Sequence, residues 1–363
     1  MRILMTTDTV GGVFDYCLEL IRGLQAYDVE VTLASLGPRP RTHQWDALRR
    51  LDNVEVYVHE GRLEWMPDCE DELVSAGQWL LELEARTRPE LVHVNGYAHA
   101  ALPWRAPAIV VGHSCVLSWW QAVHHGQAPA SWDAYRGRVR AGLSRARAVV
   151  APTAWMLAQL LTCHDVRFEG LVINNARRIE DFAAGPKRAL ILAAGRLWDR
   201  AKNLTALDTA AERLSWPVVV AGDSRDPQGR AVAPGHVELL GSLPSHELSW
   251  WMSHASIFAH PARYEPFGLA PLEAALSGCA LVLGDIGSLR EIWGDAALFV
   301  DTEDHDALAT TLRSLVDDPL RRAMMAARAH ARACRYSVAR MVAAYHHLYL
   351  EVAHDRTLSA CAS

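Results

Sequence analysis

The chain has 363 residues, of which 50% are apolar and 21% are charged, and its formal net charge at pH 7 is −6. This length exceeds one ordinary domain, and the composition is that of a globular protein. The negative charge argues against nucleic-acid binding through phosphate neutralisation, and no apolar run approaches the roughly 20 residues of a transmembrane helix.

The first half alternates short apolar runs with amphipathic stretches. The expected strands cover residues 2–7, 29–34, 54–58, 91–94, 108–111 and 148–151. The expected helices cover residues 13–24, 71–85 and 132–144. Strands that alternate with helices indicate βαβ units and a parallel sheet.

The alternation stops at residues 174–186, a polar segment with Gly and Pro that we expect to be a linker. The strands expected after it cover residues 189–194, 218–221, 237–240, 257–259, 280–283 and 298–300. The expected helices cover residues 202–214, 245–253, 269–277, 304–316, 319–334 and 338–352. The prediction is an α/β protein with two doubly wound Rossmann-like domains, residues 1–173 and 187–336, that face a ligand cleft.

The seven cysteines are scattered along the chain, without a CxxC pair and with an odd total. This pattern predicts reduced thiols and a cytoplasmic protein rather than a disulfide framework or a zinc site.

Two glutamates flank the expected start of a helix in the segment from Glu265 to Glu273. The free N–H groups at a helix start bind anions, and Gly268 lets a phosphate approach the backbone. Carboxylates on both sides of an anion site suit a sugar nucleotide, which has phosphates in its middle and hydroxyl groups at both ends. A capped helix with two solvated glutamates is the structural alternative.

A basic loop follows the first expected strand of the second half. Gly195 allows a tight turn at the carboxyl end of that strand, and Arg196 and Lys202 can converge on a diphosphate. A basic surface loop is the alternative for such a pair. Both features together, in this order, favour a donor site.

The sequence resembles the retaining GT-B-fold glycosyltransferases of family four (glycosyl transferases group 1) over nearly its whole length. The matching segments are the loop from Gly195 through Arg196 and Leu197 to Lys202, residues 220–223 and 240–244, the Glu265-x7-Glu273 arrangement, and residues 284–287. The resemblance implies a hexosyltransferase with a nucleotide-sugar donor, UDP-sugar favoured. It also implies that a C-terminal helix, residues 337–355, packs back on the first domain.

The resemblance also implies roles for individual residues. Arg196 and Lys202 would hold the diphosphate and stabilise the leaving group, and Glu273 would bind the ribose hydroxyls. Glu265 would contact the transferred sugar. The remaining donor contacts would come from the neighbourhood of the base and from backbone amides: Leu243, Phe267, Gly268 and Leu269.

In the first half, Gly11 and Gly12 resemble the family's glycine loop near the donor phosphate and the acceptor, and His113 resembles its cleft histidine near the reacting sugar carbon. Gly11-Gly12 is not a GxGxxG motif and does not indicate a dinucleotide site. A histidine after a buried strand is often only a hydrogen-bonded core residue. The preceding glycine, the place at a strand end and the resemblance favour a functional His113.

Three positions depart from the family pattern. The interval from Arg196 to Lys202 is one residue longer than usual, Asn174-Asn175 stands in place of Asn-Gly, and Ala262 replaces a serine. None removes a charge, although the longer interval leaves the reach of Lys202 open. No Asp-x-Asp follows a strand of the first half, so we expect no metal and no other cofactor, with leaving-group charge on Arg196, Lys202 and the helix start. A front-face mechanism is the expectation.

The acceptor should meet the first half of the chain. An aromatic and histidine-rich segment follows His113, and it either stacks on an acceptor or packs as a loop. Its members are Trp119, Trp120, His124, His125, Trp132 and Tyr135. Asn95 and Tyr97 are further candidates. A basic run from Arg136 to Arg147 either touches an anionic lipid or phosphorylated acceptor or is a solvated helix face, and we expect no stable membrane attachment.

The expected partners are therefore a nucleotide-sugar donor and a sugar, small-molecule or lipid-linked acceptor, and no nucleic acid. A GT-B-fold sugar-nucleotide 2-epimerase and a non-catalytic nucleotide-sugar-binding protein are the alternatives. The sequence does not specify the sugar, base, acceptor or oligomeric state.

Overall fold

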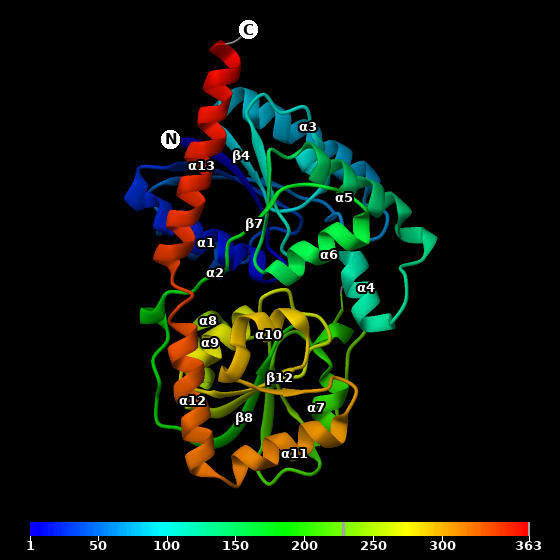
Figure 1. The fold of residues 1–363 in the computed structure, drawn as a ribbon, viewed down its shortest axis with the longest axis vertical. Coiled ribbons are helices and arrows are strands. Elements are labelled where there is room, and N and C mark those ends of the chain that lie inside the picture. The colour runs from blue at the N-terminus through cyan, green and yellow to red at the C-terminus, as the bar shows by residue number, and fades with distance from the viewer. Residues whose placement is uncertain (227–228, 362–363) are drawn as a thin grey trace. The chain divides into compact units, whose positions relative to one another are not determined.

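The computed structural model describes residues 1–226 and 229–361 and divides them into two compact units. The first unit comprises residues 1–121, 126–175 and the chain from Val338 onward, and the second consists mainly of residues 176–337. Each unit contains one fully parallel sheet with helices along it, so the predicted pair of Rossmann-like α/β domains is confirmed (Figure 1).

The first sheet has seven strands in the order β3-β2-β1-β4-β5-β6-β7. Its strands are β1 Arg2–Asp8, β2 Glu30–Leu36, β3 Val54–His59, β4 Leu91–Val94, β5 Ala108–Val111, β6 Ala148–Ala151 and β7 Gly170–Val172. The helices between them in the chain are α1 Gly12–Leu24, α2 Thr42–Leu48, α3 Glu70–Thr87, α4 Val116–His124, α5 Asp133–Arg145 and α6 Ala154–His164. The central strands are buried on both faces, which explains why they are continuous apolar runs.

The last helix, α13 Val338–Cys361, belongs to the first unit and packs along α1 (Figure 1). Their contact is close at Gly23, where an added Cβ would lie 2.3 Å from the Val342 Cγ2 atom. Tyr345, Tyr349 and Val352 of α13 are buried. These buried side chains recur at helical spacing, so one face of α13 covers apolar surface of the first unit.

The second sheet has six strands in the order β10-β9-β8-β11-β12-β13. Its strands are β8 Arg188–Ala194, β9 Val218–Ala221, β10 Glu238–Gly241, β11 Ala255–His260, β12 Ala280–Gly284 and β13 Leu298–Val300. The helices are α7 Leu204–Ala211, α8 Ser245–His254, α9 Leu269–Leu276, α10 Gly287–Trp293, α11 His305–Val316 and α12 Pro319–Ala333.

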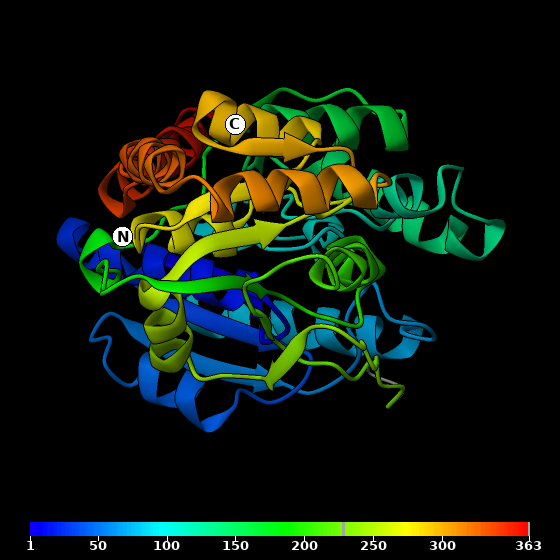
Figure 2. The same cartoon turned by 90° about the horizontal axis from the view of Figure 1, so that it is seen from below.

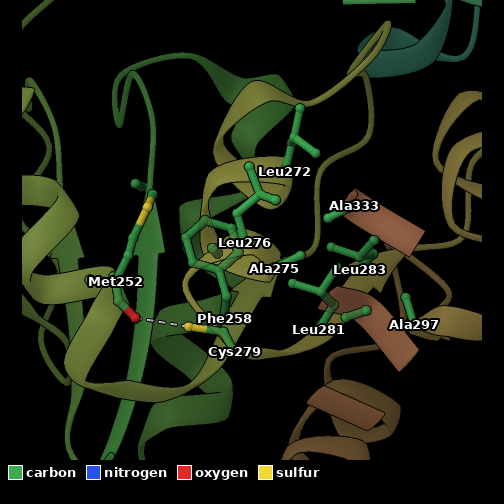
Figure 3. Packing of buried hydrophobic residues seen from close by; sticks show 14 of the residues in the cluster. Met252, Phe258, Leu272, Ala275, Leu276, Cys279, Leu281, Leu283, Ala297 and Ala333 are labelled. Atoms are coloured by element: carbon green, nitrogen blue, oxygen red, sulfur yellow. Dashed lines mark hydrogen bonds between the residues drawn. The ribbon is translucent and has the colours of Figure 1, made fainter. Parts of the chain in front are cut away.

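Alternating residues of these strands fill two separate cores. Leu192 and Phe258 join side chains of α8, α9, α10 and α12 on one face, where the Cys279 thiol donates to the Met252 carbonyl at 3.2 Å (Figure 3). Ile191 and Ile257 pack on the other face with α7 and α11, and Figure 2 shows α11 against the strands of this sheet.

Several expected elements need correction. The helix expected over residues 202–214 is wrong at its start, because Lys202 ends a short 3₁₀ turn and α7 spans only Leu204–Ala211. Helices α2, α4, α6 and α10 and strand β7 were not expected from the sequence. The aromatic segment after His113 is therefore not simply a packing loop, because it contains α4.

Candidate functional site

The predicted site residues lie at the carboxyl ends of the central strands of each sheet. In the first sheet β1 and β4 are neighbours, and in the second β8 and β11 are neighbours, although neither pair is consecutive in the chain. The connections diverge at these two places, which opens a crevice outside the strand ends and makes them the usual ligand sites of doubly wound sheets.

In the second unit, Lys202 and Glu265 form an ion pair. Lys202 Nζ donates to Glu265 Oε2 at 2.7 Å, and His260 Nε2 lies 3.1 Å from the same oxygen. The side chains of Lys202 and Glu265 are only 16% and 17% exposed, and that of His260 is 4% exposed. A cation, a carboxylate and an imidazole therefore share one largely desolvated position where β8 and β11 end.

Local capping interactions place Lys202 at this position. The Asp199 carboxylate accepts from Ala201 N and begins the 3₁₀ turn Arg200–Lys202, and Asn203 follows with a left-handed φ of 57°. Arg263 N donates to the Ala201 carbonyl at 2.8 Å, which joins the lysine loop to the loop that carries the glutamate. Lys202 reaches Glu265 although the interval from Arg196 to Lys202 is longer than the usual spacing.

The charge of Glu265 is maintained by its neighbours. Burial alone would raise the pKa of this carboxyl, but the Lys202 ammonium and the His260 hydrogen bond outweigh burial and hold it well below its usual range. Burial lowers the pKa of His260, so its imidazole is neutral at pH 7 and donates Nε2–H to the carboxylate. Ser288 Oγ also donates to the Glu265 carbonyl at 2.5 Å and fixes the backbone there.

Helix α9 begins directly beyond this group. Gly268 is its N-cap with φ 93°, a left-handed conformation that favours glycine, and its first backbone N–H groups have no partner within the helix. Phe267 is 2% exposed and packs against Tyr336, so its side chain belongs to the core. Leu269 and Leu243 are partly buried against the same core.

Glu273, in the first turns of α9, forms an ion pair with Arg177, which lies in the expected linker. Arg177 Nε donates to Glu273 Oε1 at 2.6 Å, and the two side chains are 10% and 11% exposed. Arg177 also forms an isolated parallel bridge with Ser337, so this part of the expected linker is tied to the second unit.

Arg196 makes different contacts from Lys202. Its guanidinium donates to Asp199 Oδ2 at 3.2 Å, lies over the Trp198 ring and is 40% exposed. Gly195 places it at the end of β8, as expected. The structure thus joins Lys202 to Glu265, while the Arg196 side chain is held by Asp199 and remains partly open to solvent.

In the first unit, His113 follows β5 and is partly buried. Its Nε2 lies 2.8 Å from the Oδ1 atom of Asn95, which follows β4. Burial lowers the pKa of His113 to about 3, and that of its neighbour His93 also to about 3. Both imidazoles are therefore neutral at physiological pH, and His113 is part of a polar network rather than an isolated core residue.

The other first-unit candidates differ in their surroundings. Gly11 is the N-cap of α1 with φ 98°, and Gly12 begins the helix; both are exposed. Tyr97 is buried and its hydroxyl donates to the Ser114 carbonyl at 2.7 Å. In the aromatic segment, Tyr135 is buried, whereas Trp119, Trp120 and Trp132 are half-buried and His124 and His125 are exposed.

The basic run from Arg136 to Arg147 is not one uniform patch. Arg136 pairs with Asp133, and Arg138 Nη1 donates to Glu70 at 3.0 Å. Arg145 and Arg147 line a cavity of about 570 Å³ that also includes Trp104. This cavity adjoins the amino ends of β5 and β6, and none of the predicted site residues lines it.

Four functional candidates were not expected from the sequence: His93, Arg177, Asp199 and His260. Asn95 was a candidate, but its contact with His113 was not expected. Within residues 1–226 and 229–361, no group of three or more His, Cys, Asp or Glu side chains has an arrangement that could hold a metal ion. In the same part of the chain, none of the helices combines the length and apolar character needed to cross a bilayer.

Two described families match consecutive parts of the chain. The family described as glycosyl transferases group 1 matches residues 175–332, and the one described as glycosyltransferase family 4 matches residues 10–176. The chain is 40% identical over 93 residues to the O-antigen chain mannosyltransferase B of Escherichia coli, which covers 25% of this chain and 24% of that protein.

Solved structures resemble the chain over nearly its whole length. A sucrose-phosphate synthase from Thermosynechococcus elongatus has a TM-score of 0.78 at 18% identity and covers 99% of this chain and 100% of that one. HepE from Anabaena, in complex with UDP-glucose, has a TM-score of 0.75 at 18% identity with the same coverage. These likenesses support the fold, while the first curated relatives are matched over less than half of their own length.

Proposed function

This chain belongs to the family-four glycosyltransferases, and we propose on that basis that it is a retaining hexosyltransferase that moves a hexosyl group from a nucleotide sugar to an acceptor hydroxyl. The observation that carries the proposal is the desolvated group of Lys202, Glu265 and His260 at the start of α9. The E. coli relative is named a mannosyltransferase, and the HepE structure contains UDP-glucose, which supports a hexosyl group and a nucleotide-sugar donor. We place the reaction in the cytoplasm, as the scattered cysteines predict.

The donor diphosphate would lie against positive charge and backbone N–H groups. Lys202 and Arg196 supply the cations, and the N–H groups at the start of α9, beside Gly268, supply hydrogen-bond donors. These groups stabilise the negative charge that grows on the departing phosphate oxygen. The proposed scheme needs no metal ion, because its leaving-group charge is met by the chain's own residues.

Glu265 would act as a hydrogen-bond acceptor for the transferred sugar. Its carboxylate is ionised and shared between Lys202 and His260, which makes it a poor nucleophile. We therefore propose front-face transfer. The bond from the anomeric carbon to the phosphate oxygen breaks, the bond to the acceptor oxygen forms on the same face, and the acceptor proton passes to the departing phosphate oxygen.

Glu273 would bind the ribose hydroxyls with Arg177 holding one of its oxygens. UDP is the favoured nucleotide, with Leu243 near the base. His113 is the contribution proposed for the first unit, as a neutral imidazole that contacts the transferred sugar. The acceptor, whether a free or lipid-linked sugar or another small molecule, is expected to bind the first unit.

A thermal-shift screen tests donor binding. A ligand at about 100 times its Kd stabilises the folded state by about 2.7 kcal/mol, which raises Tm measurably. We expect UDP or a UDP-sugar to give the largest shift, with GDP- and ADP-sugars as comparisons. Glu265→Gln should reduce the shift for the sugar nucleotide, whereas Glu238→Gln, at an exposed position of β10, should not.

Incubation of the protein with the bound donor then separates the possible activities. Transfer to an added acceptor, or slow donor hydrolysis in its absence, supports the proposal. An epimerised nucleotide sugar would indicate an isomerase, and binding without turnover would indicate a non-catalytic protein. A covalent glycosyl adduct on Glu265 would contradict front-face transfer, and the absence of any nucleotide-induced shift would remove the basis for a donor site.

A further inference from the structure

A chain of polar side chains connects His113 to helix α13 within the first unit. His113 Nε2 is 2.8 Å from Asn95 Oδ1, and His93 Nε2 is 3.1 Å from the same oxygen. On the other side of its ring, His93 Nδ1 is 2.7 Å from the hydroxyl of Tyr349 on α13. His93 and Tyr349 are both buried, so water does not replace these partners.

The orientation of the Asn95 side chain is set by Thr6. Asn95 Nδ2 lies 2.7 Å from the Thr6 carbonyl oxygen, which can only accept a hydrogen bond. Asn95 N also donates to Thr6 Oγ1 at 2.8 Å, which fixes the backbone. A flipped amide would place two acceptor oxygens 2.7 Å apart, so Oδ1 must face the two histidines.

This orientation determines where each imidazole carries its hydrogen. An amide oxygen only accepts, so both Nε2 atoms that point at Asn95 Oδ1 must donate, and the Tyr16 hydroxyl, at a longer 3.4 Å from His93 Nε2, can only accept there. Both rings are neutral at pH 7, because burial lowers the pKa of each to about 3, and each therefore has one ring hydrogen. His93 Nδ1 is then an acceptor for the Tyr349 hydroxyl, and His113 Nδ1 carries a free lone pair.

We propose that Asn95 is a positioning residue that holds His113 in its Nε2–H tautomer, and that the His93–Tyr349 pair supports Asn95 from helix α13. His113 then offers Nδ1 only as a hydrogen-bond acceptor, and it recognises a substrate group that donates, such as a sugar hydroxyl. This inference rests on the proposed function of His113 and adds the residues that set its chemistry. Within the described residues, Nδ1 of His113 has no hydrogen-bond partner of its own.

Nuclear magnetic resonance tests the tautomers without any assay of activity. The full chain is labelled with ¹⁵N-histidine, and long-range ¹H–¹⁵N correlations at pH 7.5 show which ring nitrogen of each histidine carries hydrogen. His113→Gln and His93→Gln assign the two signals. We expect Nε2–H for both rings in the wild-type chain and a mixture of tautomers for His113 in Asn95→Ala.

Two variants of α13 provide a matched comparison. Tyr349→Phe removes the donor to His93 Nδ1, and it should shift the Nδ1 resonance of that ring while the ring hydrogen stays on Nε2. Tyr345→Phe removes a buried hydroxyl on the same helix that has no hydrogen-bond partner among the described residues, and it should leave both rings unchanged. If Asn95→Ala does not fold, the wild-type spectrum and Tyr349→Phe still decide the tautomers.

Kinetics separates the positioning role from a structural one. Asn95→Ala should lower kcat by up to about 100-fold with a smaller change in the donor KM, and it should have little further effect in a His113→Ala background. A wild-type His113 with hydrogen on Nδ1, an unchanged tautomer in Asn95→Ala, or independent effects of the two substitutions would overturn the proposal. A chain without transferase activity would refute the proposed function and leave the spectroscopic result standing.

Discussion

Replacement of Lys202 by methionine removes one charge from a buried pair and keeps an unbranched side chain that is one atom shorter. At the 2.7 Å separation of Nζ and Glu265 Oε2, two unit charges attract by about 6 kcal/mol at an effective dielectric constant of about 20. Desolvation of both groups offsets much of this attraction, but loss of one partner from a buried pair typically costs about 3–5 kcal/mol. The His260 hydrogen bond survives, so we expect Lys202→Met to lower the free energy of unfolding by about 3 kcal/mol.

The size of this loss should depend on pH. In the wild-type chain the pKa of Glu265 lies below its unfolded value, so the carboxylate adds stability at neutral pH and loses it as pH falls through the folded pKa. Without Lys202, burial dominates and raises this pKa. As pH falls, Glu265 of the variant becomes protonated and no longer buries an unpaired charge. The difference in the free energy of unfolding between wild type and variant should therefore shrink between pH 8 and pH 5.

Urea or thermal unfolding of the full chain at pH 8, 6.5 and 5 measures this difference. A loss of about 3 kcal/mol corresponds to a fall in Tm of roughly 6–12 °C for a unit of this size. Arg213→Met is the matched control, because it removes the cation of an exposed pair with Asp306 in the same unit and should cost less than about 1 kcal/mol. Equal effects of the two substitutions, or a Lys202→Met deficit that grows as pH falls, would refute the reasoning.

Three further outcomes are expected. Gly142→Ala in α5 should lower the free energy of unfolding by about 1–3 kcal/mol, because its Cβ would lie 2.1 Å from the Tyr97 carbonyl oxygen. The Cβ of Gly137→Ala in the same helix would meet no atom within 4 Å, so this variant should be neutral or more stable by up to about 1 kcal/mol. Chemical denaturation compares the two variants. Arg177→Gln should leave the Glu273 carboxylate buried without its cation, and calorimetry should find weaker UDP binding together with lower stability of the folded chain. An unchanged affinity for UDP would exclude a role of the Arg177–Glu273 pair in binding the nucleotide. The free energy of unfolding should also fall as pH drops from 6.5 towards 4, because histidines that are held neutral in the folded chain take up protons in the unfolded chain. The fall is up to about 1.4 kcal/mol per pH unit for each such histidine, and a free energy that does not change with pH would contradict this. These histidines are His93, His99, His113 and His164, with pKa values of about 3 or 4.

The central strands were the most predictable part of the fold. The expected bounds of β4, β5, β6 and β9 coincide with the structure, because strands buried on both faces are uninterrupted apolar runs between polar residues. Helix α6 was missed although Thr153 caps it, with its side chain accepting from Met156 N. Only Met156, Leu160 and His164 are buried, at helical spacing, but apolar residues also occupy the other faces of α6 and hide this period in the sequence, so the cap is the clearest sign of where the helix begins.

The same reasoning could have identified His260. It ends β11 just as His113 follows β5, and a histidine at the carboxyl end of a buried strand was the signal that favoured His113. Arg177 could not have been found in this way. Its segment has no periodic pattern, and its partner Glu273 is 96 residues away in the chain, so only the folded second unit brings them together.

The spacing along the chain could not predict the position of the Lys202 ammonium group, because the geometry of its loop depends on two capping residues. Asp199 begins a 3₁₀ turn, and Asn203 ends it in the left-handed region, where its side chain donates to the carbonyl groups of Pro261 and Thr302 at 3.1 and 2.7 Å. Asparagine tolerates this conformation better than most residues, and its two hydrogen bonds anchor the loop to the strand ends that carry Glu265. These two caps determine the path of the loop, and the ammonium group of Lys202 reaches Glu265 although the interval from Arg196 is longer than usual.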